Sequence, residues 1–509
     1  MNKIQIDGEH LTLGQLYSVV LDGAEVELAP SAREQMNASR AVIEKLLDSN
    51  AVVYGVNTGF GKMASARISR DQIRQLQVNL VRSHACGVGA PLSENETRAM
   101  LLLRANAIAK GLSGVRPLVT ETLCAMLNHG VHPVIPSQGS VGASGDLAPL
   151  AHLAQVAIGE GEAIFRGVKM PGGDAMRQAK IAPLALEAKE GLALLNGTQG
   201  MLALLALGLR DAEIAADTAD VATALSLDAL RGSPAAFDER IARARPHPGH
   251  ATTARNLERL TRGSEIRESH RSPEKDPRVQ DPYSLRCAPQ VHGAVRDALT
   301  QIRSTVLVEL NSATDNPLVF TGDGGKLGEV ISGGNFHGQP LAMAADQLAV
   351  ALATLGGISE RRIEQMTNPQ TSQLPAFLVR EAGVNSGFMI LQVAAAALAS
   401  ESKALATPHS VDSIPTSANQ EDYVSMGMAG ARRIQPMIAN LRNILAIELL
   451  AACQGLDFLA PLRTGPEAQK AYDLVRATSN KVDTDRSLAP DIGAVAARIA
   501  AGDFSKLLK

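Results

Sequence analysis

The segment Pro340–Met366 decides the fold class, and it reads PLAMAADQLAVALATLGGISERRIEQM. Its large apolar residues recur at helical spacing, at Leu348, Leu352, Leu355 and Ile358. Alanine and glycine, which have small side chains, fill much of the remaining surface of the predicted helix. A helix of this composition is buried on more than one side, as at the centre of a helical bundle.

Other segments after residue 200 are also rich in helix formers: Met201–Leu230, Pro289–Asn311, Phe388–Ala406 and Met426–Gly455. Before residue 200, short apolar runs alternate with glycine and proline turns, and helices are expected over Ser93–Lys110 and Pro117–Asn128. The polar stretch Arg262–Pro282 is expected to be an exposed, mobile connection. We predict a mainly α protein, with an N-terminal region over residues 1–200 and a long-helix bundle with C-terminal helices over residues 201–509.

The composition also indicates a mainly helical protein and limits the kinds of partner that it can bind. Aromatic residues make up only 3% of the chain, which favours closely packed helices over a β-sandwich. The formal net charge is −3, and basic residues are dispersed among acidic ones. We therefore expect no nucleic-acid partner and no attraction to an anionic membrane.

Several features indicate a cytoplasmic protein. The N-terminus has no apolar signal segment, and the apolar stretch Leu341–Ile358 is interrupted by Asp346 and Gln347. The four cysteines lie far apart and form no CxxC pair, at positions Cys86, Cys124, Cys287 and Cys453. Such cysteines are typical of reduced thiols in the cytosol.

The sequence does not match the residue spacing of common cofactor and metal motifs. Gly55–Lys62 is not a phosphate loop, because its second glycine is misplaced and Met63 replaces the required Ser or Thr. Gly322–Gly328 lacks the dinucleotide-binding spacing. His247 and His250 stand in a stretch expected to be a loop, without a Cys or acidic ligand nearby. We expect no metal site.

The most informative string is Gly139–His152, which reads GSVGASGDLAPLAH. Five further strings accompany it: Tyr54–Gly61 (YGVNTGFG), Asn196–Gln199 (NGTQ), Gln280–Gln290 (QDPYSLRCAPQ), Ile331–His337 (ISGGNFH) and Ser417–Asp422 (SANQED). Together they resemble the aromatic amino acid ammonia-lyase and aminomutase family over nearly the whole chain. The resemblance implies a fumarase/aspartase-like superfamily fold, in which an N-terminal region carries a prosthetic-group loop beside a central long-helix bundle. It also implies a homotetramer whose active sites combine residues from three chains.

The same resemblance implies a self-made prosthetic group and no dissociable cofactor. In the family, an Ala-Ser-Gly triad cyclises to 4-methylidene-imidazol-5-one (MIO). Here the backbone nitrogen of Gly145 attacks the carbonyl carbon of Ala143, and Ser144 loses its hydroxyl as water. Glycine offers an unhindered nitrogen and backbone freedom, while serine supplies the leaving hydroxyl. The alternative is that these residues only form a tight turn before a helix that starts near Asp146.

Ammonia elimination explains why such a group is needed. The reaction removes a β-hydrogen of low acidity and expels a poor leaving group, so it requires an electrophile, a placed base and charge stabilisation. The family pattern makes Tyr54 the catalytic base, although a phenol with a pKa near 10 must be activated by its surroundings. It makes Arg286 the residue that binds the substrate carboxylate through its guanidinium fork. Further pocket or prosthetic-group residues by this pattern are Asn196, Gln280, Phe336 and Tyr283, the last counted as catalytic.

Two markers bear on the amino acid that enters. The Ser83-His84 pair resembles the version found in family members specific for histidine, and Glu421 can accept the N–H of an imidazole ring. The resemblance therefore implies L-histidine as substrate, with trans-urocanate and ammonia as products. Tyr423 stands where histidine-specific members commonly carry His, which leaves tyrosine or phenylalanine as the alternative.

Two readings from other classes remain open at this point. The related fumarase and argininosuccinate lyase group also eliminates across a carbon–carbon bond, but its Ser-Ser-x-Met-Pro-x-Lys-x-Asn loop is missing from this sequence. A catalytically inactive binding or scaffold protein is the other reading. The intact triad at Ser144, together with Tyr54 and Arg286, argues against it.

Overall fold

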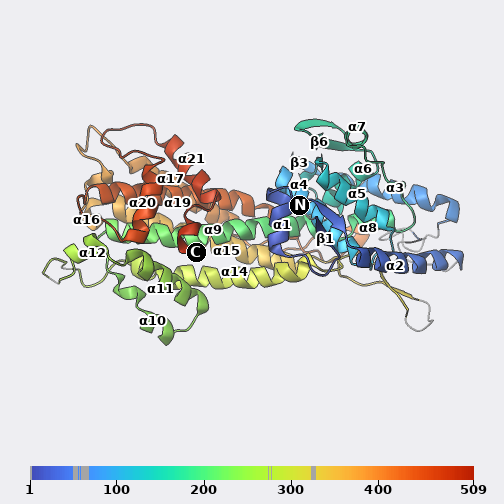
Figure 1. Cartoon of the computed structure of the whole chain (residues 1–509), viewed down its shortest axis with the longest axis horizontal. Helices are drawn as coiled ribbons and strands as arrows, with labels where there is room; N and C mark the ends of the chain where they lie inside the picture. Colours follow the sequence, from blue (N-terminus) through green and yellow to red (C-terminus); the bar gives the residue numbers. More distant parts are fainter. Residues whose placement is uncertain are drawn as a thin grey trace. The chain divides into compact units, whose positions relative to one another are not determined.

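The computed structural model describes residues 3–49, 56, 58, 68–272, 274–276, 278–322 and 328–509. Most of these residues are helical, which confirms the mainly α class (Figure 1). The chain forms two compact units, each built from three stretches of sequence. Unit 1 comprises Met1–Leu207, Arg303–Asp346 and Pro408–Arg432, and unit 2 comprises Gly208–Ile302, Gln347–Thr407 and Arg433–Lys509. The division of the sequence at residue 200 stays a prediction.

Unit 1 combines helices of moderate length with small sheets. Its helices are α1 (Leu13–Leu21), α2 (Pro30–Asp48), α3 (Ile73–His84), α4 (Glu94–Ala109), α5 (Pro117–Asn128), α6 (Leu147–Ala157), α7 (Gly172–Gln178), α8 (Glu190–Leu195) and α18 (Gly427–Arg432). In the sheets, β1 (Ile4–Ile6) pairs in parallel with β2 (Val26–Leu28), and β3 (Val88–Pro91) pairs antiparallel with β5 (Pro136–Gln138). The central strand β6 (Glu162–Phe165) pairs with β4 (Val131–Pro133) and β7 (Val168–Pro171), and β8 (Leu318–Phe320) pairs with β9 (Glu329–Ile331).

Helix α4 forms the core of unit 1. Ser93 caps it, and Ser93 and Glu96 form a reciprocal capping box that fixes the first turn. Every residue from Thr97 to Ala109 is buried, and α4 packs against α1 and α5. Helix α5 begins with a proline in its first turn, where the missing N–H costs nothing. Both helices therefore lie where the sequence predicts them.

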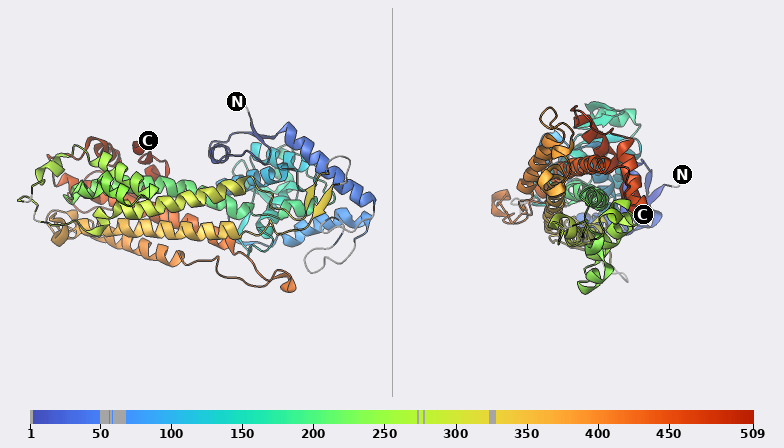
Figure 2. Two further views of the ribbon diagram at one scale, coloured as in Figure 1. Left: turned by 90° about the horizontal axis from the view of Figure 1, so that it is seen from below. Right: turned by 90° about the vertical axis from the view of Figure 1, so that its left-hand side faces the viewer.

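Unit 2 contains the long-helix bundle. Its helices are α10 (Glu239–Ala244), α11 (Pro248–Thr261), α12 (Glu265–Ser269), α13 (Tyr283–Arg286), α16 (Pro369–Ser372), α17 (Met389–Leu405), α19 (Ile434–Asp457), α20 (Pro466–Arg476) and α21 (Ala489–Ala500). Three longer helices place most of their residues in this unit: α9 (Gln199–Ala229), α14 (Ala288–Leu310) and α15 (Gln339–Thr367). Helix α19 is buried almost throughout and packs against α17 and α21. Figure 2 shows the bundle helices from the side and end-on.

Short 3-10 turns complete the described elements: η2 (Arg70–Gln72), η3 (Pro234–Phe237), η4 (Ala376–Leu378), η5 (Ser417–Asn419) and η6 (Ser505–Leu508). Among the described residues, the stretches Gln339–Thr367 and Gly427–Asp457 are long and apolar enough to cross a membrane. However, 61% and 72% of their apolar windows are buried within the protein. Such burial is expected of core helices.

Local expectations differ from the structure in two places. The stretch Arg262–Pro282 is not a purely exposed connection, because it contains α12 and buries Ile266 and His270. The expected loop at His247 is also wrong over Pro248–His250, because Pro248 occupies the first turn of α11. Proline favours that position, so the same residue that suggests a loop also starts a helix.

Candidate active site

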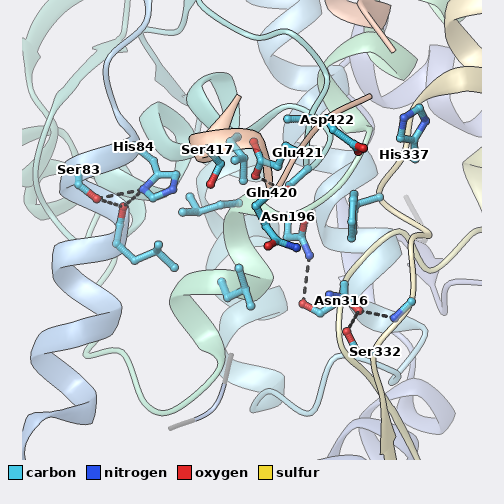
Figure 3. A pocket seen from close by; sticks show the side chains of 18 of the residues that line it. Ser83, His84, Asn196, Asn316, Ser332, His337, Ser417, Gln420, Glu421 and Asp422 are labelled. Carbon is cyan, nitrogen blue, oxygen red and sulfur yellow. Dashed lines mark hydrogen bonds between the residues drawn. The ribbon is translucent and has the colours of Figure 1, made fainter. Parts of the chain in front are cut away.

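A cavity of about 810 Å³ opens in unit 1, and segments far apart in the sequence form its wall (Figure 3). They are the last turns of α3, the loop before α6, the end of α8, and the segments around Asn316, Gly333 and Gln420. The cavity brings together six of the predicted site residues: His84, Ala143, Ser144, Asn196, Phe336 and Glu421. Gly145 follows directly in the chain.

The other predicted site residues are not among those that line the cavity in the described part of the chain. Tyr54 falls outside the described residues. Gln280, Tyr283 and Arg286 belong to unit 2 and do not line this cavity. Tyr283 is 71% exposed, and the guanidinium of Arg286 lies over its ring, with Cζ 4.5 Å from the ring centroid. This cation–π contact pairs the two side chains on α13.

The Ala-Ser-Gly triad forms a tight turn that only glycine can close. Gly142 and Gly145 adopt φ angles of +73° and +72°, in the left-handed region that favours glycine. Gly145 also forms a parallel bridge with Gly197. A Cβ atom on Gly145 would lie 2.0 Å from the carbonyl oxygen of Gly197. Both the backbone conformation and the space around it therefore require glycine here.

Asp146 ties this turn to the start of α9. Its backbone N–H donates to the carbonyl of Gly197 at 2.7 Å, and its Oδ2 accepts the N–H of Met201 at 2.7 Å. The carboxyl thus satisfies a free backbone donor in the first turn of α9. Because Asp146 is fully buried, desolvation raises its pKa to about 7.

The pKa of Asp146 predicts a pH-dependent contribution to stability. A folded-state pKa of about 7, above the ordinary value of 3.8, means that the folded protein binds this proton more tightly than the unfolded chain does. The contribution is complete below the unfolded pKa and is lost as pH rises to the folded pKa. We expect Asp146→Asn to remove this component, which is on the order of a few kcal/mol.

Thermal midpoints from pH 5 to 8 test this prediction. The midpoint of the wild-type protein should fall relative to that of Asp146→Asn as the pH rises. Asp174→Asn, at an exposed carboxylate of α7, serves as the control and should follow the wild type. Parallel curves for the wild type and Asp146→Asn would contradict the prediction.

Glu421, labelled in Figure 3, lines the same cavity as Ala143 and Ser144. The hydroxyl of Ser144 donates to its Oε1 at 3.5 Å, and the hydroxyl of Thr416 donates to its Oε2 at 2.8 Å. Backbone hydrogen bonds of 2.9 and 3.3 Å also join Thr416 and Glu421. These contacts hold the carboxylate in place while leaving it able to accept a further hydrogen bond.

His84 ends α3 with its ring oriented by the helix itself. Its Nδ1 lies 2.9 Å from the carbonyl of Leu80 and 3.0 Å from the hydroxyl of Ser83 (Figure 3). Since a carbonyl can only accept, Nδ1 carries the hydrogen and Nε2 is left as the acceptor. Burial lowers the pKa of His84, so the ring is neutral at neutral pH. The neutral form offers a lone pair to a ligand N–H.

Asn196 contributes a third acceptor. Its Nδ2 donates to Asp315 Oδ1 at 3.2 Å and to the carbonyl of Asn316 at 3.1 Å, which fixes the orientation of the amide. Asp315 is in turn paired with Lys189 at 2.6 Å, and both are buried. The buried Oδ1 of Asn196 has no hydrogen-bond partner among the described residues. Such an atom is suited to a bound ligand or prosthetic group.

Arg104 supports the turn that carries Asn196. Its buried guanidinium donates to the carbonyls of Asn196, at 3.0 Å, and Ala193, and to Gln199 Oε1 at 2.7 Å. Desolvation lowers the pKa of Arg104 to about 10, which still leaves it charged at neutral pH. The charge strengthens these bonds and anchors the junction between α8 and α9.

Sequence reasoning missed several cavity residues, although signals for some were present. Leu76, Asn79 and Leu80 share one face of α3 with Ser83 of the predicted Ser83-His84 marker, because the four repeat at spacings of three and four. Ser417 and Gln420 lie within a string already quoted. Asn316, by contrast, carries no motif. Among the described residues, no group of three His, Cys, Asp or Glu side chains is placed to hold a metal.

The cavity is therefore rich in acceptors and holds no described cation. Glu421, Nε2 of His84 and Oδ1 of Asn196 can each accept a hydrogen bond from a ligand, and no Lys or Arg lines the wall in the described part of the chain. This donor and acceptor balance suits a ligand that carries N–H groups. It does not supply a partner for a ligand carboxylate.

Known proteins resemble this chain over nearly its whole length. The family model for aromatic amino acid lyase matches residues 11–477. The chain is 55% identical to a histidine ammonia-lyase from Koribacter versatilis (strain Ellin345), covering 99% of each protein. Its structure is similar to those of a histidine ammonia-lyase from Trypanosoma cruzi (TM-score 0.91, 44% identity, 100% and 95% coverage) and a tyrosine aminomutase from Streptomyces globisporus (TM-score 0.94, 39% identity, 99% and 98% coverage).

Proposed function

The chain belongs to the aromatic amino acid lyase family, of the fumarase/aspartase-like superfamily, and we propose that within it the chain is a histidine ammonia-lyase. It converts L-histidine to trans-urocanate and ammonia, the first step of histidine breakdown. The substrate assignment rests on one observation: His84 and Glu421 line the same cavity as Ser144. The curated relatives support the same assignment.

His84 and Glu421, the two groups proposed to face the substrate ring, suit an imidazole ring. Nε2 of His84 and the carboxylate of Glu421 both accept, and an imidazolium ring has two N–H groups to donate. A phenyl ring would bring the Glu421 carboxylate no N–H donor and would cover it with apolar surface in a partly buried site. Tyrosine or phenylalanine remains the alternative substrate, since Tyr423 replaces a His common in histidine-specific relatives. Tyr423 is 58% exposed and stacks on His337 with ring centroids 6.2 Å apart.

We propose that Ala143, Ser144 and Gly145 form the MIO group. The nitrogen of Gly145 bonds to the carbonyl carbon of Ala143, whose oxygen leaves as water, and Ser144 loses a second water to become a methylidene. The left-handed Gly145 and the buried, unpaired Oδ1 of Asn196 fit such a ring. The group supplies an electrophile that captures the substrate amine and makes it a better leaving group. No dissociable cofactor is part of the proposal.

The other roles follow the family pattern. Tyr54 takes the β-proton, and Arg286 binds the substrate carboxylate. Gln280, Tyr283 and Phe336 complete the pocket. Since no described cation lines the cavity, we propose that the α13 segment of a neighbouring subunit supplies Arg286, as in a homotetramer with shared sites.

Exposed apolar side chains support such an assembly. On unit 2, Val350, Ile390 and Val393 are each at least half exposed. Exposed apolar patches of this kind often mark subunit contacts. We also propose a cytoplasmic location, which fits four cysteines that form no disulfide.

Product formation by the purified protein tests the function. L-histidine, L-tyrosine and L-phenylalanine are offered separately, and the ultraviolet absorbance of the product is followed. Urocanate from histidine alone supports the proposal. Formation of coumarate or cinnamate would agree with the proposed reaction but contradict histidine as the substrate. Absence of any product would contradict the lyase assignment.

Glu421→Gln is expected to lower kcat/KM for L-histidine by about 10- to 100-fold, the worth of a hydrogen bond to a charged acceptor. Glutamine keeps the size of the side chain and its contact with Thr416 but removes the charge that pairs with the ring. Steady-state kinetics measure the loss. Glu162→Gln, at an exposed carboxylate on β6 paired with Lys169, is the matched control. Equal activity of the two variants would remove Glu421 from the substrate site.

A further inference from the structure

The helix that carries Arg286 is too short to hold its own position. Helix α13 has four residues, fewer than an isolated helix needs to persist in water. Its placement must therefore come from tertiary contacts. Leu285 is buried in the core of unit 2, and the preceding Asp281 accepts the backbone N–H of Ser233 at 2.6 Å. These contacts fix one side of the segment, and the carbonyls of Tyr283 and Leu285 accept the N–H of Cys287, whereas the carbonyl of Ser284 accepts from another helix.

We propose that the buried ion pair Arg362–Glu448 is the positioning element that sets Arg286 for the substrate carboxylate. The inference rests on the proposed function, in which Arg286 binds that carboxylate. Arg362 on α15 is completely buried. Its Nη1 donates to the backbone carbonyl of Ser284 on α13, at 3.2 Å. A charged donor thus holds the α13 backbone two residues before Arg286.

Glu448 keeps the Arg362 guanidinium from turning. Nε of Arg362 donates to Oε1 of Glu448 at 2.5 Å, and Nη2 donates to Oε2 at 3.0 Å, which is the two-bond fork that arginine alone provides. The hydroxyl of Ser226 donates to Oε1 at 2.8 Å, and that of Ser359 donates to Oε2. Residues of α9, α15 and α19 therefore fix this carboxylate together.

The neighbouring helix α14 is tied to the same pair. It starts directly after Cys287, and its His292 places Nε2 3.5 Å from Nη1 of Arg362. Nδ1 of His292 bonds to Asp220 at 2.8 Å, and Asp220 is paired with Arg296. Burial lowers the pKa of His292, so its ring is neutral and Nε2 can accept from Arg362. Arg362 thus contacts both α13, which ends with Arg286, and α14, which follows it in the chain.

Stability alone does not explain a fully buried ion pair. Removing two charges from water is costly, and apolar replacements of similar size are often neutral or stabilising. The contact of Arg362 with α13 offers a functional reason for the cost. Binding a carboxylate through two parallel bonds demands accurate placement of Arg286, because a shift of about 1 Å is enough to disrupt a productive geometry.

Two inhibitors separate this role from a structural one. The probe 3-(imidazol-4-yl)propanoate carries the ring and the carboxylate of the substrate, whereas 4-methylimidazole carries the ring alone. We expect Arg362→Lys, which keeps the charge but loses the fork, to weaken binding of the propanoate about tenfold. Binding of 4-methylimidazole should be unchanged. Calorimetry on the intact assembly measures both affinities.

A double variant and a control guard against misfolding. Arg362→Met with Glu448→Leu removes the pair but keeps an apolar core, so it should fold and show the same selective loss. Arg476→Lys changes another arginine of unit 2 that is paired with Asp457 and has no contact with α13, and it should leave both affinities unchanged.

Arg286→Lys distinguishes the two levels of the proposal. If Arg286→Lys weakens the propanoate and the Arg362 variants do not, the positioning role is wrong while the carboxylate assignment stands. If Arg286→Lys leaves the propanoate unaffected, the assignment of Arg286 fails and the positioning role fails with it. Equal losses for both probes in folded Arg362 variants would also overturn the positioning role.

Discussion

Ser144→Ala is expected to lower kcat/KM for L-histidine by at least about 10³-fold, the scale on which removal of an electrophilic element affects an enzyme. Alanine has no hydroxyl to lose as water, so the methylidene carbon cannot form. The substrate amine would then leave unassisted. Intact mass reports the same change independently: the wild-type chain should be lighter than its sequence by two water molecules, and the variant should lack the dehydration at residue 144.

The loss in Ser144→Ala should not reflect misfolding. The hydroxyl of Ser144 makes one long hydrogen bond, to Glu421 at 3.5 Å, so its removal disturbs little packing. Ser312→Ala provides the control, because it makes the same chemical change at an exposed serine that bonds to the carbonyl of Val308. Full activity of Ser144→Ala, or a wild-type mass equal to that of the unmodified sequence, would exclude the prosthetic group.

Helix bounds were predictable where local residues mark both ends of the helix. The helix over Pro117–Asn128 has the predicted bounds, because proline favours its first turn and Gly130 follows its end with a positive φ. The predicted helix Met426–Gly455 instead divides at Arg433 into α18 and α19. Pro436 in the first turn of α19 is a local signal for this break, because proline has no N–H for an intrahelical bond and disfavours continuation of the preceding helix.

Site residues were predictable where they stand in recognisable motifs. The residues that orient them were not predictable, because they lie far away in the sequence. The quoted strings predicted Ser144, Asn196 and Glu421, which the cavity brings together. They did not predict the buried pair of Lys189 and Asp315 that orients the Asn196 amide. Lysine and aspartate are usually exposed, so composition alone places both on the surface. Only the folded backbone shows that these two charges meet inside unit 1.

The sequence also does not show which predicted site residues share a compact unit. The strings give no sign that Arg286 and His84 belong to different compact units. Their assignment to one reaction comes from the family, and the geometry of each is fixed separately, by α13 and by the end of α3. This separation makes the supporting contacts of α13 a distinct subject for mutagenesis.

Gly145→Ala is the second change expected to remove activity, again by about 10³-fold or more, because the prosthetic group could not form. A methyl group here faces two obstacles. The φ angle of +72° is unfavourable for alanine by roughly 1–2 kcal/mol. In addition, the new Cβ would lie 2.0 Å from the carbonyl oxygen of Gly197, a distance that requires the backbone to move. The displaced nitrogen of residue 145 would then be poorly placed to attack the carbonyl carbon of Ala143.

Gly167→Ala separates these two obstacles. Gly167, in the turn between β6 and β7, has a φ of +77° but no atom within 4 Å of a new Cβ, so it carries the backbone strain alone. We expect Gly167→Ala to lose a little thermal stability, to keep the mass deficit of two waters and to retain activity. Gly145→Ala should keep the full sequence mass. If Gly145→Ala still showed the deficit, the close approach of Gly197 would not control cyclisation, and the turn would tolerate a side chain that its geometry indicates it cannot.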